Sequence, residues 1–183
     1  MSVLDKIVAA ITPPESDEAR IEARGKATDA AARSPWLAMV LDHHQQIEAS
    51  FADVEAAGTA TERRAHLKRL ALILTGHSLA EEAVLYPAMS LSDQKAHAGE
   101  AYLEQSAAKV QLAALDEMDP MSQDFVDKLG HLQGAVAHHM YREEGTWFPN
   151  LVTESEVVQS KLSSRYREEF DRYMTPMSLP MGT

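Results

Sequence analysis

Two segments of the sequence place a histidine and a glutamate at the same short spacing. His77 and Glu81 form one HxxxE pair, and His139 and Glu143 form a second pair farther along the chain. In a helix this spacing puts the two side chains one turn apart on the same face, so an imidazole and a carboxylate can bind the same ion. The residue types and their spacing therefore predict a metal centre with nitrogen and oxygen ligands.

The similarity between the two segments extends beyond these pairs. Residues 77–87 and 139–149 agree in the histidine, in two successive glutamates, in an aromatic residue and in the closing proline. The sequence therefore contains an internal repeat of a site. The aromatic residues near the prolines are expected to close one end of the fold by packing; they are Tyr86, Trp147 and Phe148.

The rest of the chain predicts the elements that position these residues. Alanine and leucine are frequent, apolar residues recur every three or four positions, and no convincing strand pattern occurs. Capping residues, glycines and prolines bound the expected helices, which cover residues 34–58, 61–87, 92–118, 122–149 and 153–174. The first four of these helices predict an all-α fold, an up-down-up-down four-helix bundle on short loops.

The apolar stripes of these predicted helices lead to the candidate ligands. On the second helix the stripe of leucines continues at helical spacing to His77 and Glu81. On the fourth helix a similar stripe reaches His139 and Glu143. On the first helix His44 lies between apolar residues of the same face. These side chains are therefore expected to point into the bundle.

Additional helices are expected on both sides of the bundle. The expected divisions are an N-terminal helical extension (1–33), the bundle (34–150) and a C-terminal helix with a flexible tail (151–183). In the extension, a short helix over residues 1–11 is followed by a polar, loosely attached helix over residues 15–32. The C-terminal helix is expected to begin with a capping box of Thr153 and Glu156 and to pack outside the bundle.

Inward carboxylates require a partner. A buried, unpaired carboxylate costs several kcal/mol, and two that face one another cost more unless a cation lies between them or one is protonated. A metal ion between the facing helices resolves this conflict. A bundle that uses buried His–Glu pairs only as polar contacts is the alternative, but buried ion pairs stabilise folds poorly.

The composition limits both the ligands and the partners. The chain has 28 acidic and 17 basic residues and a formal net charge of -11, which opposes binding to nucleic acid or to an anionic membrane. It has no cysteine, so a metal must use nitrogen and oxygen ligands, which iron, manganese and zinc all accept. The N-terminal apolar stretch is too short and too charged for a signal peptide or membrane span, so a cytoplasmic location is expected.

Taken together, His44 and the two repeated segments resemble the hemerythrin-like HHE cation-binding domain in motif, order and helix placement. In that family, the pattern H, HxxxE, H, HxxxE on successive helices holds a di-iron centre bridged by the two carboxylates. The resemblance therefore implies iron, and a centre that binds dioxygen, nitric oxide or peroxide. The metal ligands expected on this basis are His44, His77, Glu81, His139 and Glu143.

The third predicted helix departs from the family pattern. Gln105 stands where the family usually has a histidine. Glu104 is expected to turn inward as the replacement ligand, in preference to His97, which lies at another depth in the bundle. The substitution leaves an asymmetric di-iron centre, a single iron and a centre with more open positions as alternatives. Tyr102 is expected to pack in the core, the alternative being a hydroxyl that approaches the metal.

The sequence predicts other positions for several polar residues near the candidate ligands. His43 and His138 each precede a ligand candidate and therefore point away from it, toward the surface or toward a supporting position. Glu82 and Glu144 are expected to be solvated, with orientation of a ligand histidine or steering of cations as the alternatives. The remaining histidines expected at the surface are His66 and His131.

The sequence favours a stand-alone di-iron protein that binds or reacts with dioxygen, nitric oxide or peroxide in stress response, sensing or iron handling. An oxidase or peroxidase-like enzyme is one alternative. A metal-free or degenerate bundle that acts as a protein-interaction module is the other, and stability unchanged by chelation would favour it. A small diatomic ligand or peroxide is the expected partner, and a protein partner or a homodimer stays open.

Overall fold

The computed structural model describes residues 15–175, which fold almost entirely into helices. The α-helices are α2 (Asp17–Ala31), α3 (Pro35–Ala56), α4 (Ala60–Ala80), α5 (Tyr86–Leu91), α6 (Lys95–Asp116), α7 (Gln123–Arg142), α8 (Phe148–Leu151) and α9 (Glu156–Met174). Two π-helical segments join them, η1 (Glu81–Leu85) and η2 (Glu143–Trp147). Within residues 15–175 there is no strand, so the predicted all-α class is confirmed. The expected helix over residues 1–11 and the expected tail lie outside the described residues.

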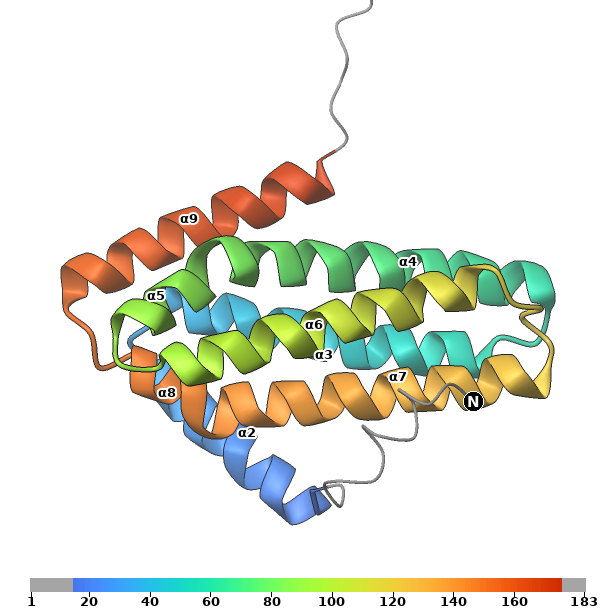
Figure 1. Ribbon diagram of the computed structural model, residues 1–183, viewed down its shortest axis with the longest axis horizontal. Helices are drawn as coiled ribbons and strands as arrows, with labels where there is room; N and C mark the ends of the chain where they lie inside the picture. The colour runs from blue at the N-terminus through green and yellow to red at the C-terminus, as the bar shows by residue number, and fades with distance from the viewer. Residues whose placement is uncertain (1–14, 176–183) are drawn as a thin grey trace, which may run out of the picture.

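The four longest helices of the predicted bundle pack side by side. Figure 1 shows α3, α4, α6 and α7 along the long axis of the molecule, each running opposite to the helix before it. Short loops join α3 to α4 and α6 to α7 at the same end of the molecule. This is the up-down-up-down bundle predicted from the sequence.

Local sequence signals set the beginnings of the bundle helices. At α4 a reciprocal capping box forms, because the Thr59 hydroxyl accepts from the Glu62 amide and the Glu62 carboxylate accepts from the Thr59 amide. At α7 the Ser122 hydroxyl accepts from the amide of Phe125. These caps satisfy amides that have no partner inside their helices.

The expected capping box at the start of the C-terminal helix is wrong. Its helix, α9, begins at Glu156, and Ser155 is the N-cap residue. The Thr153 hydroxyl instead donates to the carbonyl of Asn150, 2.7 Å away. Thr153 therefore closes the turn that follows α8 and takes no part in α9.

Both repeated segments contain the same irregularity. Glu81 is the first residue of η1 and Glu143 is the first residue of η2. A π-turn holds an extra residue, so it shifts every later side chain around the helix axis, and such turns are frequent at functional sites. Pro87 falls in the first turn of α5, where its missing amide is tolerated. The helical path therefore continues past Pro87 to Leu91, beyond the predicted end.

A polar layer separates two apolar cores inside the bundle. One core contains Trp36, Leu41 and Phe148, close to the flanking helices. The other core contains Ile47 and Leu74 and extends toward the far loops. His44 lies between Leu41 and Ile47 in the sequence of α3, so the candidate ligands occupy the level at which one core ends and the other begins. The surrounding apolar side chains keep water away from this layer.

The N-terminal helix is attached more closely than the sequence suggests. Helix α2 packs on α3 and on η2, and it buries Ala23 and Ala27. Its Arg24 donates to the carboxylate of Glu144 at 2.6 Å. The expectation of a loosely attached polar helix is therefore wrong, because a small apolar face and an ion pair both fix α2 to the bundle.

The C-terminal helix lies across the outside of the bundle, as expected. Helix α9 packs on α4 and α3 (Figure 1), and its Tyr166 is completely buried. Gly76 allows this approach, since a Cβ at that position would meet the Tyr173 ring at 3.0 Å. Helix α9 therefore covers α4 beside His77.

No helix within the described residues is both long and apolar enough to cross a membrane.

Candidate metal centre

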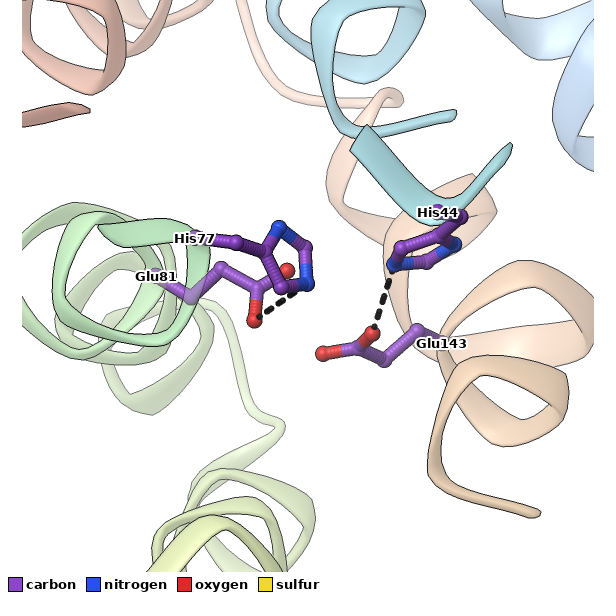
Figure 2. Close-up of side chains that lie close together, drawn as sticks. All are labelled: His44, His77, Glu81 and Glu143. Atoms are coloured by element: carbon purple, nitrogen blue, oxygen red, sulfur yellow. Dashed lines mark ion pairs between the residues drawn. The ribbon is translucent and has the colours of Figure 1, made fainter. Parts of the chain in front are cut away.

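Candidate ligands from three bundle helices meet in the polar layer. His44 comes from α3, His77 from the end of α4 and Glu81 from the first position of η1. His139 lies at the end of α7, and Glu143 follows at the first position of η2. Figure 2 shows His44, His77, Glu81 and Glu143 pointing toward one another from different parts of the bundle. The side chains that the repeat predicted are therefore brought together.

The inner nitrogen of each histidine faces a carboxylate. His44 Nε2 lies 3.3 Å from Glu143 Oε2, and His77 Nε2 lies 3.3 Å from Glu81 Oε2. His139 Nε2 lies 3.1 Å from Glu143 Oε1. Suitable ligand atoms of four of these residues all lie within 4.8 Å of one another; the residues are His44, His77, Glu81 and Glu143. A single cation can therefore reach two imidazoles and two carboxylates.

Several polar atoms in this layer have no hydrogen-bond partner. His44 Nε2, Glu81 Oε1 and Glu143 Oε2 are all buried and make no hydrogen bond, although His44 Nε2 and Glu143 Oε2 lie 3.3 Å apart. The side chains of Glu81 and Glu143 are 0% exposed, so water does not compensate them. Burying unpaired polar atoms is costly, and a cation among them would satisfy one nitrogen and two oxygens at once. The residues present thus fit a metal ion.

The outer nitrogen of His44 is held by a carboxylate and an arginine. His44 Nδ1 donates to Glu144 Oε1 at 2.6 Å. Arg24 of α2 in turn donates to the other oxygen of Glu144 at 2.6 Å. Glu144 is 2% exposed, so the expectation of a solvated helix-face residue is wrong and the alternative, orientation of a ligand histidine, is what its position supports.

The outer nitrogen of His139 has a similar pair of partners. Glu104 Oε2 lies 2.7 Å from His139 Nδ1, and Glu104 Oε1 accepts from Arg142 at 2.5 Å. The carboxylate of Glu104 therefore stands behind His139, on the side away from Glu143. The sequence suggested Glu104 as an inward replacement ligand, but the structure places it as a support for His139, because Arg142 holds it at the outside of the bundle.

The outer nitrogen of His77 contacts the C-terminal helix. Tyr166 Oη lies 3.0 Å from His77 Nδ1 and 2.9 Å from His43 Nδ1. If His77 donates from Nδ1, the Tyr166 hydroxyl can donate onward to His43. His43 is buried beside the ring of Phe170, with ring centroids 3.9 Å apart. Of the two expectations for His43, the supporting position fits and the surface position does not.

Tyr86 lies inside the centre, a position that the sequence analysis missed. Its hydroxyl is 3.0 Å from Glu143 Oε1, 3.2 Å from Glu81 Oε2 and 3.0 Å from His139 Nε2. Gln105 donates to the same hydroxyl at 2.5 Å and to Glu81 Oε2 at 2.6 Å. The expectation of simple aromatic packing is wrong for Tyr86. The repeat contained one clue to this role: Tyr86 has a hydroxyl where the equivalent residue of the other segment, Phe148, has none.

Other polar residues lie away from the cluster. Tyr102 is 37% exposed and its hydroxyl donates to the backbone carbonyl of Glu82, so the expected core packing is wrong and the hydroxyl does not approach the ligands. Its ring packs edge-on against Tyr86, with ring centroids 5.1 Å apart. The Glu82 carboxylate accepts from Lys109 at 2.6 Å. His97 stacks on Trp147, with ring centroids 5.8 Å apart. The histidines that pair with acidic residues outside the cluster are His66 with Asp53 and His138 with Glu15.

The buried groups have strongly shifted pKa values. Burial would lower the pKa of His44, but Glu143 and Glu144 outweigh it and raise the pKa to about 9. Burial likewise opposes a charge on His139, but Glu143 and Glu104 raise its pKa to about 10. For Glu81, burial and the neighbouring charge of Glu143 raise the pKa well above its usual range. These directions are the ones expected of a buried cluster of carboxylates and imidazoles in which no cation lies.

The remaining ligand candidates shift in the opposite directions. Burial and the charge of His44 hold the pKa of His77 well below its usual range, which leaves its imidazole neutral. Burial opposes ionisation of Glu143, but the nearby charges of His139 and His44 outweigh it and lower its pKa. A neutral imidazole and an ionised carboxylate are the forms that bind metals.

Comparison with known proteins agrees with this geometry. The profile of the hemerythrin HHE cation binding domain matches residues 37–152, well over half of the chain. Neither the curated proteins nor the solved structures compared with the chain gave a match. The matched residues contain the four bundle helices and the buried histidine and glutamate side chains. On these grounds, the chain belongs to the hemerythrin HHE cation-binding family.

Proposed function

We propose that this protein binds non-haem iron in the polar layer and that the iron binds or reacts with dioxygen, nitric oxide or peroxide. The proposed ligands are the clustered side chains of His44, His77, Glu81 and Glu143, with His139 beside them. Stress response, sensing and iron handling are the roles such a centre would serve. A cytoplasmic location belongs to the same proposal.

The observation that supports the proposal most strongly is the shared orientation of the three histidines. Each directs Nε2 toward a carboxylate of the cluster and has a hydrogen-bonding partner at Nδ1. Those outer partners are Glu144, Tyr166 and Glu104. A histidine that binds a metal through one nitrogen almost always donates from the other, which fixes its tautomer and ring orientation.

The ligand set favours iron among the metals that accept it. Imidazole and carboxylate ligands suit iron, manganese and zinc, and family membership supports iron. Bound ferrous iron would supply a Lewis acid that can also give up an electron, which is the chemistry that small oxygen and nitrogen ligands require.

The protein residues would control which molecules reach the centre. His44, Glu81 and Glu143 are each 0% exposed, so a bulky substrate cannot touch them without opening the bundle. The two apolar cores on either side of the layer exclude water from it. This confinement supports small ligands such as the diatomic gases and peroxide.

Visible absorption of the iron-loaded protein tests the proposal. We expect the spectrum to change on exposure to at least one of dioxygen, nitric oxide and peroxide. The double variant Glu81→Gln/Glu143→Gln keeps the side-chain shapes but removes both carboxylates, so it should lose iron and the spectral change. His131→Gln, at an exposed position, is the matched control and should behave like the wild type.

Two results would count against the proposal. Equal spectral changes in the wild type and the double variant would assign the iron to a site outside the polar layer. A wild type that folds fully but takes up no iron would favour the alternative of a metal-free interaction module.

A further inference from the structure

We infer that the centre holds one metal ion, and that the Tyr86 hydroxyl occupies the position where a second ion would have to bind. The inference rests on the proposed function and specifies the number of ions. The sequence favoured a di-iron centre, whereas the position of Tyr86 favours a mononuclear one. Three features of the polar layer support this conclusion.

The first feature is that the Tyr86 hydroxyl contacts one oxygen of each carboxylate and that the other oxygen has no hydrogen bond. Glu81 Oε2 and Glu143 Oε1 both lie within hydrogen-bonding distance of Tyr86 Oη, at 3.2 and 3.0 Å. Glu81 Oε1 and Glu143 Oε2 have no hydrogen-bond partner. Tyr86 thus contacts one oxygen of each carboxylate. The free oxygen of Glu143, Oε2, lies 3.3 Å from His44 Nε2, and the shared oxygen of Glu81, Oε2, lies 3.3 Å from His77 Nε2, so both carboxylates still reach an ion beside these two histidines.

The second feature is the crowding around Tyr86 Oη. Besides the two carboxylates, His139 Nε2 lies 3.0 Å away and Gln105 Nε2 lies 2.5 Å away. A second ion bridged by both carboxylates and bound by His139 would need to sit among these atoms, at about 2.0–2.2 Å from its ligands. The phenol oxygen already stands there, so the ion and the hydroxyl exclude one another.

The third feature is the residue opposite Tyr86. Gln105 replaces the histidine that the family pattern has on this helix, and its amide donates to both Tyr86 and Glu81. The amide nitrogen that faces this position has no lone pair to offer a cation, whereas an imidazole nitrogen has one. The amide oxygen of Gln105, which has lone pairs, makes no hydrogen bond and is not the atom that contacts Tyr86 and Glu81. Gln105 therefore stabilises the phenol in the second position, and a metal ion there would have His139 as its only imidazole.

The internal repeat shows why only one side of the centre is affected. Tyr86 and Phe148 are equivalent positions, each directly after a π-helical segment. Phe148 has no hydroxyl and packs edge-on against Trp36, with ring centroids 5.4 Å apart. The phenol therefore enters from the η1 side alone, and the pseudo-symmetry of the two HxxxE segments is broken at that residue.

Iron counting combined with electron paramagnetic resonance tests the inference. We expect about one iron per wild-type chain and, after oxidation, the signal of an isolated ferric ion. The double variant Tyr86→Phe/Gln105→His removes the hydroxyl and restores an imidazole. It should hold about twice as much iron, and coupling between two ferric ions should remove most of that signal.

Control variants separate this inference from a general change in packing. Tyr102→Phe removes a hydroxyl that binds only the backbone carbonyl of Glu82, so it should keep the wild-type iron content and signal. The single variant Gln105→His should keep about one iron per chain, because Tyr86 still occupies the second position. Circular dichroism establishes that each variant is folded.

The outcomes distinguish the two proposals. Two irons and a coupled signal in the wild type would overturn the mononuclear centre and leave the proposed function intact. No iron in a folded wild type would overturn both. If the double variant does not fold, the iron content and signal of the wild type decide by themselves.

Discussion

At the scale of single residues, the central feature is that the two ring nitrogens of each histidine have different partners. The inner nitrogens of His44, His77 and His139 face Glu81 or Glu143. The outer nitrogens have protein partners, and two of these partners, Glu144 and Glu104, are themselves held by arginines. A charge on either carboxylate strengthens the electron donation of the histidine in front of it.

The first prediction concerns the pH dependence of the metal-free protein. The pKa of His44 is raised to about 9 in the folded state, so its charged form stabilises the fold fully below about pH 6.5, its ordinary pKa. That stability is lost as the pH rises through about 9. His139, with a pKa raised to about 10, acts in the same direction. We therefore expect the metal-free protein to become less stable between neutral pH and pH 10.

Iron should remove most of this pH dependence. A metal ligand must be deprotonated, so bound iron replaces the protons in the cluster. Thermal unfolding of metal-free and iron-loaded protein from pH 6.5 to pH 9 measures the effect, and the difference in Tm should grow with pH. A difference that shrinks over this range would contradict the proposed ligand set.

The second prediction concerns Glu144. Replacing a residue that supports a metal ligand typically weakens metal binding by about 10- to 100-fold. Glu144→Gln keeps an acceptor for His44 but removes the charge, so we expect about a 10-fold increase in the Kd for iron. Glu82→Gln is the matched control, because Glu82 is the repeat equivalent of Glu144 and pairs with Lys109 instead. Equal effects of the two variants would sink this interpretation.

At the scale of elements, the flanking helices take part in the centre although both lie outside the family match over residues 37–152. Helix α2 contributes Arg24, which binds the Glu144 carboxylate. Helix α9 contributes Tyr166, which joins His77 and His43. The bundle alone would leave Glu144 without its arginine and His77 without its outer partner. These helices therefore complete the support of the candidate ligands.

The third prediction tests the contribution of α9. Tyr166→Phe removes only the hydroxyl between His77 and His43 and keeps the buried ring. We expect weaker iron binding, by about 10-fold, because His77 loses the group that fixes its tautomer. Calorimetric titration with ferrous iron under anaerobic conditions measures it. Tyr173→Phe, on the same helix and half-exposed, should change nothing; a loss of affinity there would point to general disruption of α9.

Periodicity predicted the elements well and the side-chain environment less completely. The stripes that lead to His77 and His139 indicated inward-facing ligands, because a regular helix repeats its buried face every three or four residues. The π-helical segments break that regularity directly after each HxxxE pair. Tyr86 lies beyond the break, so helical spacing from His77 could not place its hydroxyl among the ligands.

The residues that support the candidate ligands could not be predicted from the sequence for a different reason. Arg24 and Glu144 are 120 residues apart in the sequence, and Tyr166 and His77 are 89 apart. Helical periodicity within one segment contains no information about such pairs. Glu104 was identified as close to the site, but its direction depends on Arg142 of the neighbouring helix.

At the scale of the whole molecule, the polar layer couples metal binding to folding. It contains the buried carboxylates of Glu81 and Glu143 and several polar atoms without a hydrogen bond, and it separates the two apolar cores. Without a cation, these buried groups destabilise the fold, because some of them must be protonated and others lack a partner. A bound ion should therefore stabilise the entire bundle.

The fourth prediction is the size of that stabilisation. A ligand that binds only the folded state at 100 times its Kd contributes about 2.7 kcal/mol. For a chain of this length, 1 kcal/mol shifts Tm by about 2–4 °C, so iron should raise Tm by about 5–10 °C. A chelator should reverse the shift. Scanning calorimetry with and without iron provides the comparison, and identical Tm values would favour the metal-free interaction module.

The most direct test of the central claim is a crystal structure of the iron-loaded protein with anomalous scattering measured at the iron edge. We predict an anomalous peak inside the bundle, within ligand distance of His44, His77, Glu81 and Glu143. A peak only at surface acidic residues, or an ordered bundle with no peak in the polar layer, would contradict the assignment of this cluster as the iron centre.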